Sequence, residues 1–379
     1  MANDFALMFE RLQLPRDLPR VHAAVAPLAP LLQALLGEAA CNEDGQLSVM
    51  VGSRAGQAVL LAPCRDQALE LPLRLGEKVL WRQSLPAMRL TGGAQDGVGS
   101  AADALDLLAR LRVAMPGRAL VLSDVEVDSP LYQAVLRARE AGYVLTRNAP
   151  DTHLYHRFVD SYDAFFQQRS SKQRTQLRKK EKVFVERYGR EYAFREYRQP
   201  GQVAEFLRAA RAINRKTYQF RMFGERIDDD EASIAAGRRA AAAGRFRSFI
   251  LWHRDQPLCF IVGHQRIDGT FEHRCTGFDP EHRDAAPGIN CNILLLQRLY
   301  EEDRPRVLDF GGGDADYKRL FANESRLTAD PVLLPRRWRF LLARSLYERS
   351  AWANESAVRV LKRLGLQQAL KRWLRGTPP

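Results

Sequence analysis

The order of strands and helices expected after Gly189 constrains the fold of this chain more than any other feature. Polar and apolar residues alternate over residues 191–197, which predicts a half-buried strand. Two helical segments follow, the second over residues 228–244, and then three strands joined by tight turns. A helix that begins near Pro287, a short strand, a short helix and one or two closing strands complete the order. Such a mixture of strands and helices indicates an α/β domain.

Residues 1–160 also alternate between the two patterns and predict a second α/β region. The first 36 residues are apolar and interrupted by prolines, which favours short helices. Ser129 and Pro130 have the residue types of a helix start, and Gly142 has that of a helix end. A chain of 379 residues is long enough for two domains, or three.

Positive charge is concentrated in two segments. The chain has 58 Lys and Arg against 45 Asp and Glu, a net charge of +13. Residues 169–198 carry +7 and residues 336–375 carry +9, so the rest of the chain is slightly acidic. We expect residues 161–190 to form one long basic helix that ends at Gly189. Concentrated basic charge favours an anionic partner, although a solvated helix face gives the same pattern.

The C-terminal basic segment has two apolar faces that would point in nearly opposite directions on a continuous helix. We therefore predict a break or kink at Gly365. Trp338, Trp352 and Trp373 lie among Arg and Leu residues, as in helices at a membrane interface. The same residues suit packing on the protein's own domains, so both interpretations stay open.

Composition excludes several classes of protein. Hydrophobic residues make up 46% and charged residues 27%, as in ordinary globular proteins. The five cysteines are far apart with no Cys-x-x-Cys pair, which is typical of a reduced cytoplasmic chain. We find no apolar signal-peptide core and no spanning segment. No cluster has zinc-ligand spacing, and the carboxylates at 228–231 suit a helix start, so we expect no metal.

Two motifs narrow the fold. The first is Gly-Phe-Asp-Pro-Glu followed by Pro-Gly, over residues 277–288, and the second is Asp-Phe-Gly-Gly-Gly-Asp followed by Tyr-Lys, over 309–318. With the element order, they resemble the Fem-like branch of the GNAT superfamily of N-acyltransferases, the branch associated with cellulose and exopolysaccharide synthesis. The resemblance covers residues 165–325.

The resemblance implies tandem GNAT-like domains, each with a mixed central sheet flanked by helices. On this basis we expect an N-terminal GNAT-like domain over 1–160 and a basic linking helix over 161–190. A catalytic GNAT-like domain would follow over 191–335, and a basic amphipathic helical tail over 336–379.

Acyl transfer to an amine needs a base and hydrogen-bond donors aimed at the thioester oxygen. The resemblance implies that the strand over 270–278 lines the acyl site. Alternation places Glu272 and Thr276 on one face, and His273 and Cys275 on the other. Glu272 or His273 is therefore the candidate base, depending on which face meets the cleft. A solvent-facing pair on an edge strand is the alternative.

The helix start at Pro287 is a candidate phosphate site because backbone N–H groups and the positive end of the helix dipole meet there. The resemblance implies that the pyrophosphate of coenzyme A lies at this position. The family loop Q/R-x-x-G-x-G/A reads Arg-Asp-Ala-Ala-Pro-Gly here and lacks the first glycine. An acyl-carrier protein or aminoacyl-tRNA therefore remains an alternative donor, and an ordinary helix start remains the alternative without a ligand. The candidate donor-binding residues are Arg283, Pro287, Gly288, Ile289, Asn290, Gly311, Gly312 and Lys318.

The glycine run after residue 309 also resembles the cofactor loop of S-adenosylmethionine methyltransferases. That loop follows the first strand of its fold, whereas only 66 residues follow Gly313 here. In the acyltransferase interpretation, the glycines end a strand that opens for the donor, and Tyr317 is the general acid for the leaving thiolate. A packed tyrosine hydroxyl is the alternative. Tyr218, Asp309 and Asp316 are the candidate substrate contacts.

The sequence thus predicts an enzyme that moves an acyl group from acyl-CoA or an acyl-carrier-protein thioester to an amine by direct attack. The expected acceptor is a small molecule, such as a sugar or a cell-envelope precursor. We expect a cytoplasmic protein with peripheral membrane contact through residues 336–375, and no nucleic-acid partner other than tRNA. The alternatives are an aminoacyl-tRNA-dependent transferase and a non-enzymatic module of the same fold that binds nucleic acid or anionic membrane.

Overall fold

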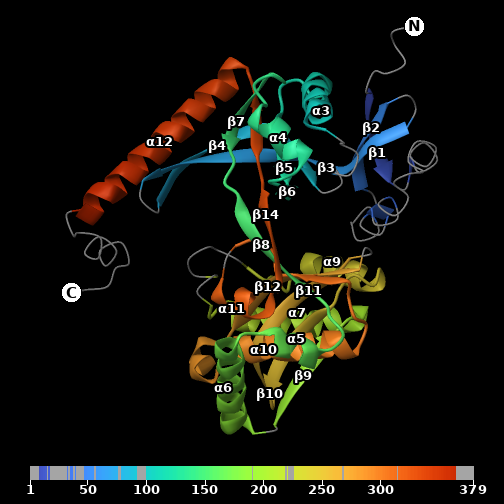
Figure 1. Ribbon diagram of the computed structural model, residues 1–379, viewed down its shortest axis with the longest axis vertical. Coiled ribbons are helices and arrows are strands. Elements are labelled where there is room, and N and C mark those ends of the chain that lie inside the picture. Colours follow the sequence, from blue (N-terminus) through green and yellow to red (C-terminus); the bar gives the residue numbers. More distant parts are fainter. Residues whose placement is uncertain are drawn as a thin grey trace. The chain divides into compact units, whose positions relative to one another are not determined.

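The chain forms two compact units in the computed structural model (Figure 1). Unit 1 comprises Met1–Arg11, Val49–Pro150 and Ala329–Pro379, and unit 2 comprises Leu12–Ser48 and Asp151–Thr328. The four-segment division expected above stays a prediction. The structure describes residues 8–14, 16–17, 32, 35–36, 39, 47–54, 57–75, 78–91, 100–189, 191–217, 220, 226–266, 269–313 and 315–363.

Unit 1 is built on a mixed sheet with the strand order β1-β2-β3-β4-β5-β15-β7. Strands β4 and β5 pair in parallel, whereas β3–β4 and β5–β15 are antiparallel. The strands are β1 (Met8–Leu14), β2 (Leu47–Arg54), β3 (Gln57–Leu75), β4 (Lys78–Thr91), β5 (Ala119–Ser123), β7 (Tyr143–Arg147) and β15 (Val332–Pro335), with the short β6 (Val125–Glu126) beside them in the sequence.

Helices cover both faces of this sheet. Helices α3 (Ala101–Ala114) and α4 (Pro130–Leu136) bury Leu108 and Leu131 in one cluster with Leu120 of β5. Helix α12 (Trp338–Arg363) buries Phe340 in a second cluster with Val121, which directly follows Leu120 and therefore points to the opposite face of β5. The predicted cap is confirmed, since the Ser129 hydroxyl accepts a hydrogen bond from the backbone N–H of Tyr132. The predicted helix end at Gly142 is wrong, because α4 already ends at Leu136 and turns lead from there to Gly142.

Unit 2 contains a second mixed sheet, whose strands follow the order β14-β8-β13-β12-β11-β10-β9. Its strands are β8 (Asp151–Arg157), β9 (Tyr192–Tyr197), β10 (Ser248–His253), β11 (Gln256–Gln265), β12 (Thr270–Phe278), β13 (Val307–Asp309) and β14 (Glu324–Ala329). The helices are α5 (Tyr162–Gln168), α6 (Ser171–Tyr188), α7 (Val203–Asn214), α9 (Glu231–Ala242), α10 (Pro287–Glu301) and α11 (Asp316–Phe321), with short 3-10 turns at Pro200–Gln202 and Pro280–Ala285.

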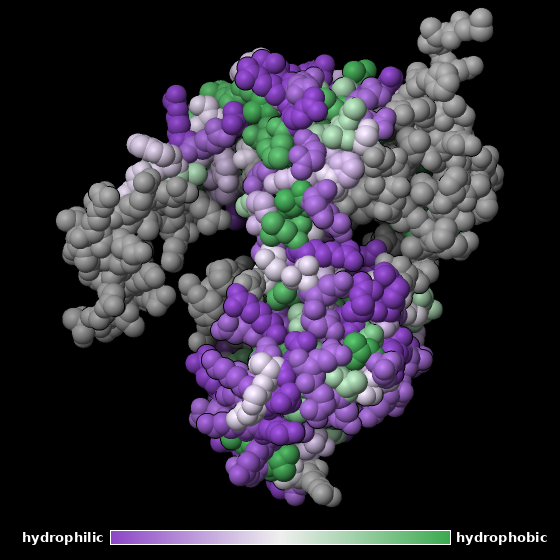
Figure 2. Space-filling view, viewed as in Figure 1, coloured by the Kyte–Doolittle hydropathy of each residue, from purple (hydrophilic) through white to green (hydrophobic). Residues whose placement is uncertain are grey.

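Alternate residues of β10 define the two apolar layers of unit 2. Phe249 and Leu251 pack in a cluster with α5, α6, α10 and α11, whereas Ile250 packs in a cluster with α7. The surface of unit 2 that Figure 2 displays is mostly hydrophilic, with hydrophobic side chains in small scattered spots. The mixed α/β architecture with helices on both faces of each sheet confirms the predicted fold class.

Residues 161–190 form two helices and not the single long helix expected from their basic run. The helix is interrupted at Arg169–Ser170, because Ser170 caps the start of α6 through a capping box with Gln173. Helix α6 nevertheless has an apolar stripe, since Leu177, Phe184 and Tyr188 are buried in the cluster of α10. This basic segment is therefore packed into the core of unit 2.

The start of the C-terminal tail is helical through Arg363. The predicted break at Gly365 and the side chain of Trp373 lie outside the described residues. Among the residues that the structure describes, no helix is both long and apolar enough to cross a membrane.

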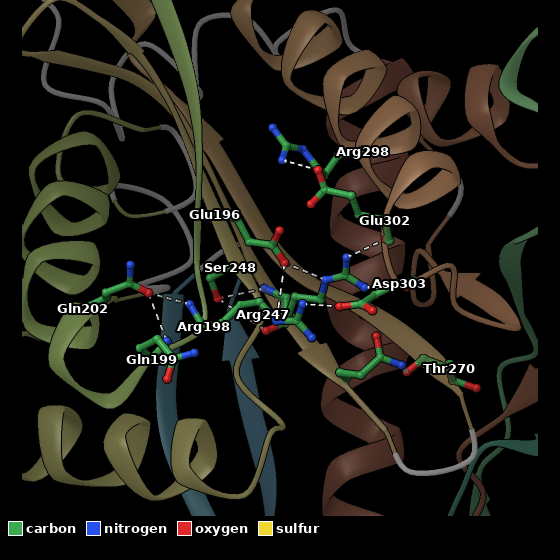
Figure 3. Close-up of polar contacts among 12 residues, drawn as sticks. Glu196, Arg198, Gln199, Gln202, Arg247, Ser248, Thr270, Arg298, Glu302 and Asp303 are labelled. Carbon is green, nitrogen blue, oxygen red and sulfur yellow. Dashed lines mark hydrogen bonds and ion pairs between the residues drawn. The ribbon is translucent and has the colours of Figure 1, made fainter.

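A buried arginine fixes the C-terminal end of α10 to the sheet (Figure 3). Arg247 is only 1% exposed, and its Nε donates to Glu196 of β9 at 2.8 Å. Its two terminal nitrogens donate to the carbonyl oxygens of Asp303 at 2.8 Å and Glu302 at 3.1 Å, directly after α10. These bonds satisfy carbonyls that the helix leaves unpaired, and they hold α10 at one end.

Candidate functional site

Strands β12 and β13 begin as a parallel pair and then separate. They pair at Thr270–Val307, Phe271–Leu308 and Glu272–Asp309, where β13 ends, whereas β12 continues to Phe278. Gly311 and Gly313 have φ of +72° and +88°, a conformation that favours glycine and turns the chain away after β13. The parting of the two strands leaves the last part of β12 free to line a cavity.

A cavity of about 600 Å³ opens there. Apolar side chains and glycines form most of its wall, which is the usual composition of a pocket for a small organic ligand. The lining residues are Lys216, Thr217, Thr276, Gly277, Phe278, Pro280, Arg283, Ala286, Pro287, Gly288, Ile289, Asn292 and Tyr317.

The N-terminal end of α10 forms one side of this cavity. Ala286 precedes the helix in the left-handed region, with φ of +51°, and no side chain caps the helix. A Cβ on Gly288 would lie 3.2 Å from the ring of Phe278, so glycine keeps this wall open. Arg283 adds a cation to the same wall. An uncapped positive helix end beside a guanidinium suits an anionic group such as phosphate.

Of the candidate donor-binding residues, Arg283, Pro287, Gly288 and Ile289 line the cavity and Asn290 does not. Asn290 is 3% exposed, and its Nδ2 donates to the carbonyl oxygens of Lys180 at 3.2 Å and Ala286 at 3.0 Å. It therefore holds the first turn of α10 against α6.

The glycine loop after β13 is braced from within. The Asp309 carboxylate accepts a hydrogen bond from the N–H of Gly311 at 2.7 Å, and Lys318 donates to the carbonyl of Gly312 at 2.6 Å and of Gly311 at 3.3 Å. Lys318 is 9% exposed, and burial lowers its pKa. These residues shape the loop and are not among the residues that line the cavity, and neither is the exposed Asp316. Tyr218 lies outside the described residues.

Glu272 belongs to an ionic cluster away from the cavity wall. Its carboxylate lies 3.3 Å from Arg266 and 3.7 Å from His264. Burial by itself would raise the pKa of Glu272, but the hydrogen bond from His264 and the charges of Arg266 and Arg274 outweigh it, and the pKa falls to about 2. Such a carboxylate binds a proton weakly, which makes it a poor general base near neutral pH.

His273 is buried beside the cavity. Its ring lies 5.6 Å from the ring of Phe310 and 6.4 Å from that of Tyr317. Burial lowers the pKa of His273 to about 4, so the imidazole is neutral at pH 7. The expected face assignment is wrong beyond this residue. A bulge opposite Val262 and Gly263 shifts the register, and Cys275 packs with the α7 cluster and not with Phe271.

Tyr317, in the first turn of α11, brings a hydroxyl to the cavity wall. Burial raises the pKa of Tyr317 to about 12. The hydroxyl therefore stays protonated at neutral pH and can donate a hydrogen bond or a proton into the cavity.

The cavity end near Asp279 also holds a group of potential metal ligands: Asp279, Glu281 and His282. Each already has a partner. Lys216 donates to Asp279 at 2.7 Å and lies 3.5 Å from Glu281, and His282 contacts Tyr188 and Gln256. These contacts explain the cluster without an ion.

Residues 171–319 match the family model described as the acetyltransferase (GNAT) domain. This part of the chain is therefore similar to GNAT acetyltransferase domains. Its strands β9 to β13 with α7, α9 and α10 hold the cavity described above.

Solved structures also resemble the chain, at low sequence identity. FemX is 11% identical, with 76% of this chain and 87% of FemX covered at a TM-score of 0.50. A tandem GNAT protein from the clavulanic acid biosynthesis pathway is 11% identical, with 86% and 98% covered at 0.45. L-PGS from Bacillus licheniformis is 14% identical, with 76% and 85% covered at 0.43. Identities this low show likeness of fold alone. A search of curated proteins found no relative.

Several residues of the cavity were not predicted from the sequence. Thr217 lies three residues after the end of α7, and Phe278 is the last residue of β12. Only the tertiary fold brings these two residues together at the cavity. Asn292 had a signal: it is a second amide, two residues after Asn290, directly before an apolar run of α10, and it lines the cavity. Its Nδ2 donates to the carbonyl of Gly288 at 2.8 Å, one turn earlier.

Proposed function

We propose that this chain is an acyltransferase that moves an acyl group from a thioester donor to an amine by direct attack. The observation that carries this proposal is the cavity where β12 and β13 separate, with the uncapped end of α10 on one side and Tyr317 on another. GNAT domains in general use acyl-CoA as co-substrate, and residues 171–319 match that family.

The cavity suits the parts of an acyl-CoA. Its apolar wall, which includes Phe278, Pro287 and Ile289, fits a pantetheine arm and an acyl chain. Arg283 and the start of α10 would hold the phosphates. An acyl-carrier-protein thioester presents the same arm, so we propose the two as alternative donors.

The proposed chemistry forms a C–N bond and breaks the C–S bond. The neutral amine attacks the thioester carbonyl, and Tyr317, which stays protonated, gives its proton to the departing thiolate. For the proton that the amine loses, the positions and pKa values support His273 over Glu272, since His273 is neutral beside Tyr317. The pKa of His273, about 4, is still low for a base at pH 7, so we expect the rate to rise with pH until the acceptor amine is deprotonated.

The resemblance to the Fem-like branch supports an amine on a sugar or cell-envelope precursor as acceptor. The link to cellulose or exopolysaccharide synthesis, and a place in the cytoplasm, are parts of the same proposal.

Thermal unfolding of the full chain with acetyl-CoA, longer acyl-CoAs and acylated carrier protein tests the donor. We expect at least one of these thioesters to raise the melting temperature, because a ligand that binds the folded state stabilises it. A shift with aminoacyl-tRNA but with none of the thioesters would sink the thioester proposal in favour of the aminoacyl transferase. Donor binding without turnover on any amine would favour a non-enzymatic module.

A further inference from the structure

Helix α12 carries apolar side chains on two opposite sides. On the inner side, Phe340 is 5% exposed and Ala343 is fully buried, and Tyr347 packs partly against the same cluster of unit 1. On the outer side, five large apolar side chains are exposed. They are Trp338 (74%), Leu341 (39%), Leu342 (51%), Leu346 (38%) and Trp352 (67%), which we call the α12 outer face.

The spacing of these residues makes one continuous stripe. Trp338, Leu342 and Leu346 follow each other at intervals of four residues, and Leu341 and Trp352 are eleven residues, or about three turns, apart. The stripe runs along roughly 20 Å of helix at 1.5 Å per residue. Single exposed apolar residues are common on protein surfaces, but a contiguous stripe with two tryptophans indicates a surface that binds something.

Basic residues accompany the stripe. Arg336, Arg339 and Arg349 are exposed, and Arg349 falls at the angular position between Trp338 and Leu342 on a regular helix. Glu348 already pairs with Arg344 at 2.8 Å. Residues 336–375 together carry a net charge of +9. Such a face attracts an anionic surface and repels a second copy of itself.

We propose that the α12 outer face docks the protein on a membrane that contains anionic phospholipid, with the helix axis parallel to the bilayer plane. Tryptophan suits the headgroup region because its ring is apolar and its N–H finds a polar partner there. The arginines place their apolar stems along the stripe and their guanidinium groups among lipid phosphates. The leucines enter the acyl boundary. This inference rests on α12 alone and is independent of the proposed function.

Flotation of the full chain with vesicles tests the proposal. We expect binding to vesicles of phosphatidylcholine with a quarter phosphatidylglycerol, weak binding to phosphatidylcholine alone, and a loss of binding as salt is raised. The triple variant Trp338→Ser, Leu342→Gln, Trp352→Ser should bind the anionic vesicles at least tenfold more weakly. The charge variant Arg339→Gln, Arg349→Gln should reduce the difference between the two vesicle types.

A matched control removes exposed apolar side chains elsewhere in unit 1. Val113 and Leu136 are 72% and 53% exposed, so Val113→Ser, Leu136→Ser should leave vesicle binding unchanged. Melting curves of every variant check that it is folded. Equal flotation of the triple variant and the unsubstituted chain would overturn the proposal, and so would equal binding to neutral and anionic vesicles. A dimer that the triple substitution converts to monomer, with no vesicle binding, would assign the face to a second copy instead.

Discussion

Both units contain a parallel strand–helix–strand arrangement, and the two differ at the point where a donor site would form. In unit 1, β4 and β5 stay paired through Thr91–Ser123, the last residues of both strands, and Arg89 bonds the Ser123 hydroxyl at 2.6 Å. In unit 2, pairing stops at Glu272–Asp309 while β12 continues for six residues. Of these two parallel pairs, the one that separates borders the 600 Å³ cavity.

The helices that follow β4 and β12 also differ in how their first turns are capped. Ser100 caps α3 by accepting from the N–H of Asp103, whose carboxylate also lies in the first turn. Helix α10 has no side-chain cap and no acid in its first turn. A capping hydroxyl and a nearby carboxylate satisfy the positive helix end in unit 1, whereas the end in unit 2 is left for a ligand. The same topology thus leaves an open cavity and an uncapped helix start in unit 2, and these are the two features on which the proposed donor site depends.

Substitution of Arg247 should have the largest effect and should weaken unit 2 specifically. Arg247→Met leaves the mostly buried Glu196 with only the longer contact to Arg198, at 3.7 Å, and frees the carbonyls after α10. We expect a loss of ~3–5 kcal/mol, as for other broken buried ion pairs, measured by denaturant unfolding. Arg137→Met, which removes an exposed ion pair of unit 1, is the control and should leave the unfolding curve unchanged. Equal effects of the two substitutions would contradict the structural role of Arg247.

Substitution of Tyr317 tests whether catalysis belongs to unit 2. Tyr317→Phe removes the proposed acid, and we expect kcat to fall roughly 10²-fold or more with little change in the donor KM. Tyr132→Phe is the matched control, since this buried unit 1 hydroxyl accepts from Asn148 at 2.8 Å. It should cost about 1 kcal/mol of stability and leave kcat unchanged. An unchanged kcat in Tyr317→Phe would remove the role of general acid.

Side chains added at the starts of α3 and α10 test which of the two units binds the donor. Gly288→Val pushes methyl groups toward Phe278 and into the cavity, so we expect donor affinity to drop about tenfold, or ~1.4 kcal/mol. Ala102→Val at the exposed first turn of α3 should not alter it. Calorimetric titration with the donor measures both. A larger loss in Ala102→Val would move the donor site to unit 1.

Mild acid should destabilise unit 2 through its buried histidines. Burial lowers the pKa values of His156 and His273 to about 4, below the ordinary value of 6.5. The unfolded chain therefore binds protons first as the pH falls, and stability is lost between pH 6.5 and 4, by at most ~3 kcal/mol for each imidazole. Melting curves from pH 7.5 to 4.5 measure the loss, which should shrink in His273→Asn. A stability independent of pH across this window would contradict the burial of both rings.

Local signals predicted several helix starts because each start is marked by a few adjacent residues. Other expectations were wrong, since residues 8–14 form the strand β1 where short helices were expected. Ser129 and Pro130 start α4, and Pro287 begins α10. The break before α6 had its signal too, since Ser170 and Gln173 form a capping box, but the continuous basic run concealed it.

The candidate site was only partly predictable. Some of the cavity wall was accessible, because Arg283, Gly288 and Tyr317 lie in or beside the two motifs that the sequence analysis singled out. The choice between Glu272 and His273 was not, because it depends on which layer covers each face of the sheet. The bulge beyond His273 lies in β12 at Arg274, opposite Val262 and Gly263 of β11, and the alternation of residues in β12 does not reveal it.

The two-ended attachment of α10 bears on how fast a donor would bind. Asn290 fixes its first turn to the Lys180 carbonyl, and Arg247 fixes the residues after its last turn. A helix held at both ends has little freedom left to lose when a ligand arrives, so the entropic cost of ordering is largely met during folding. We therefore expect donor association near the rate of diffusional encounter, without a slow isomerisation phase in stopped-flow traces.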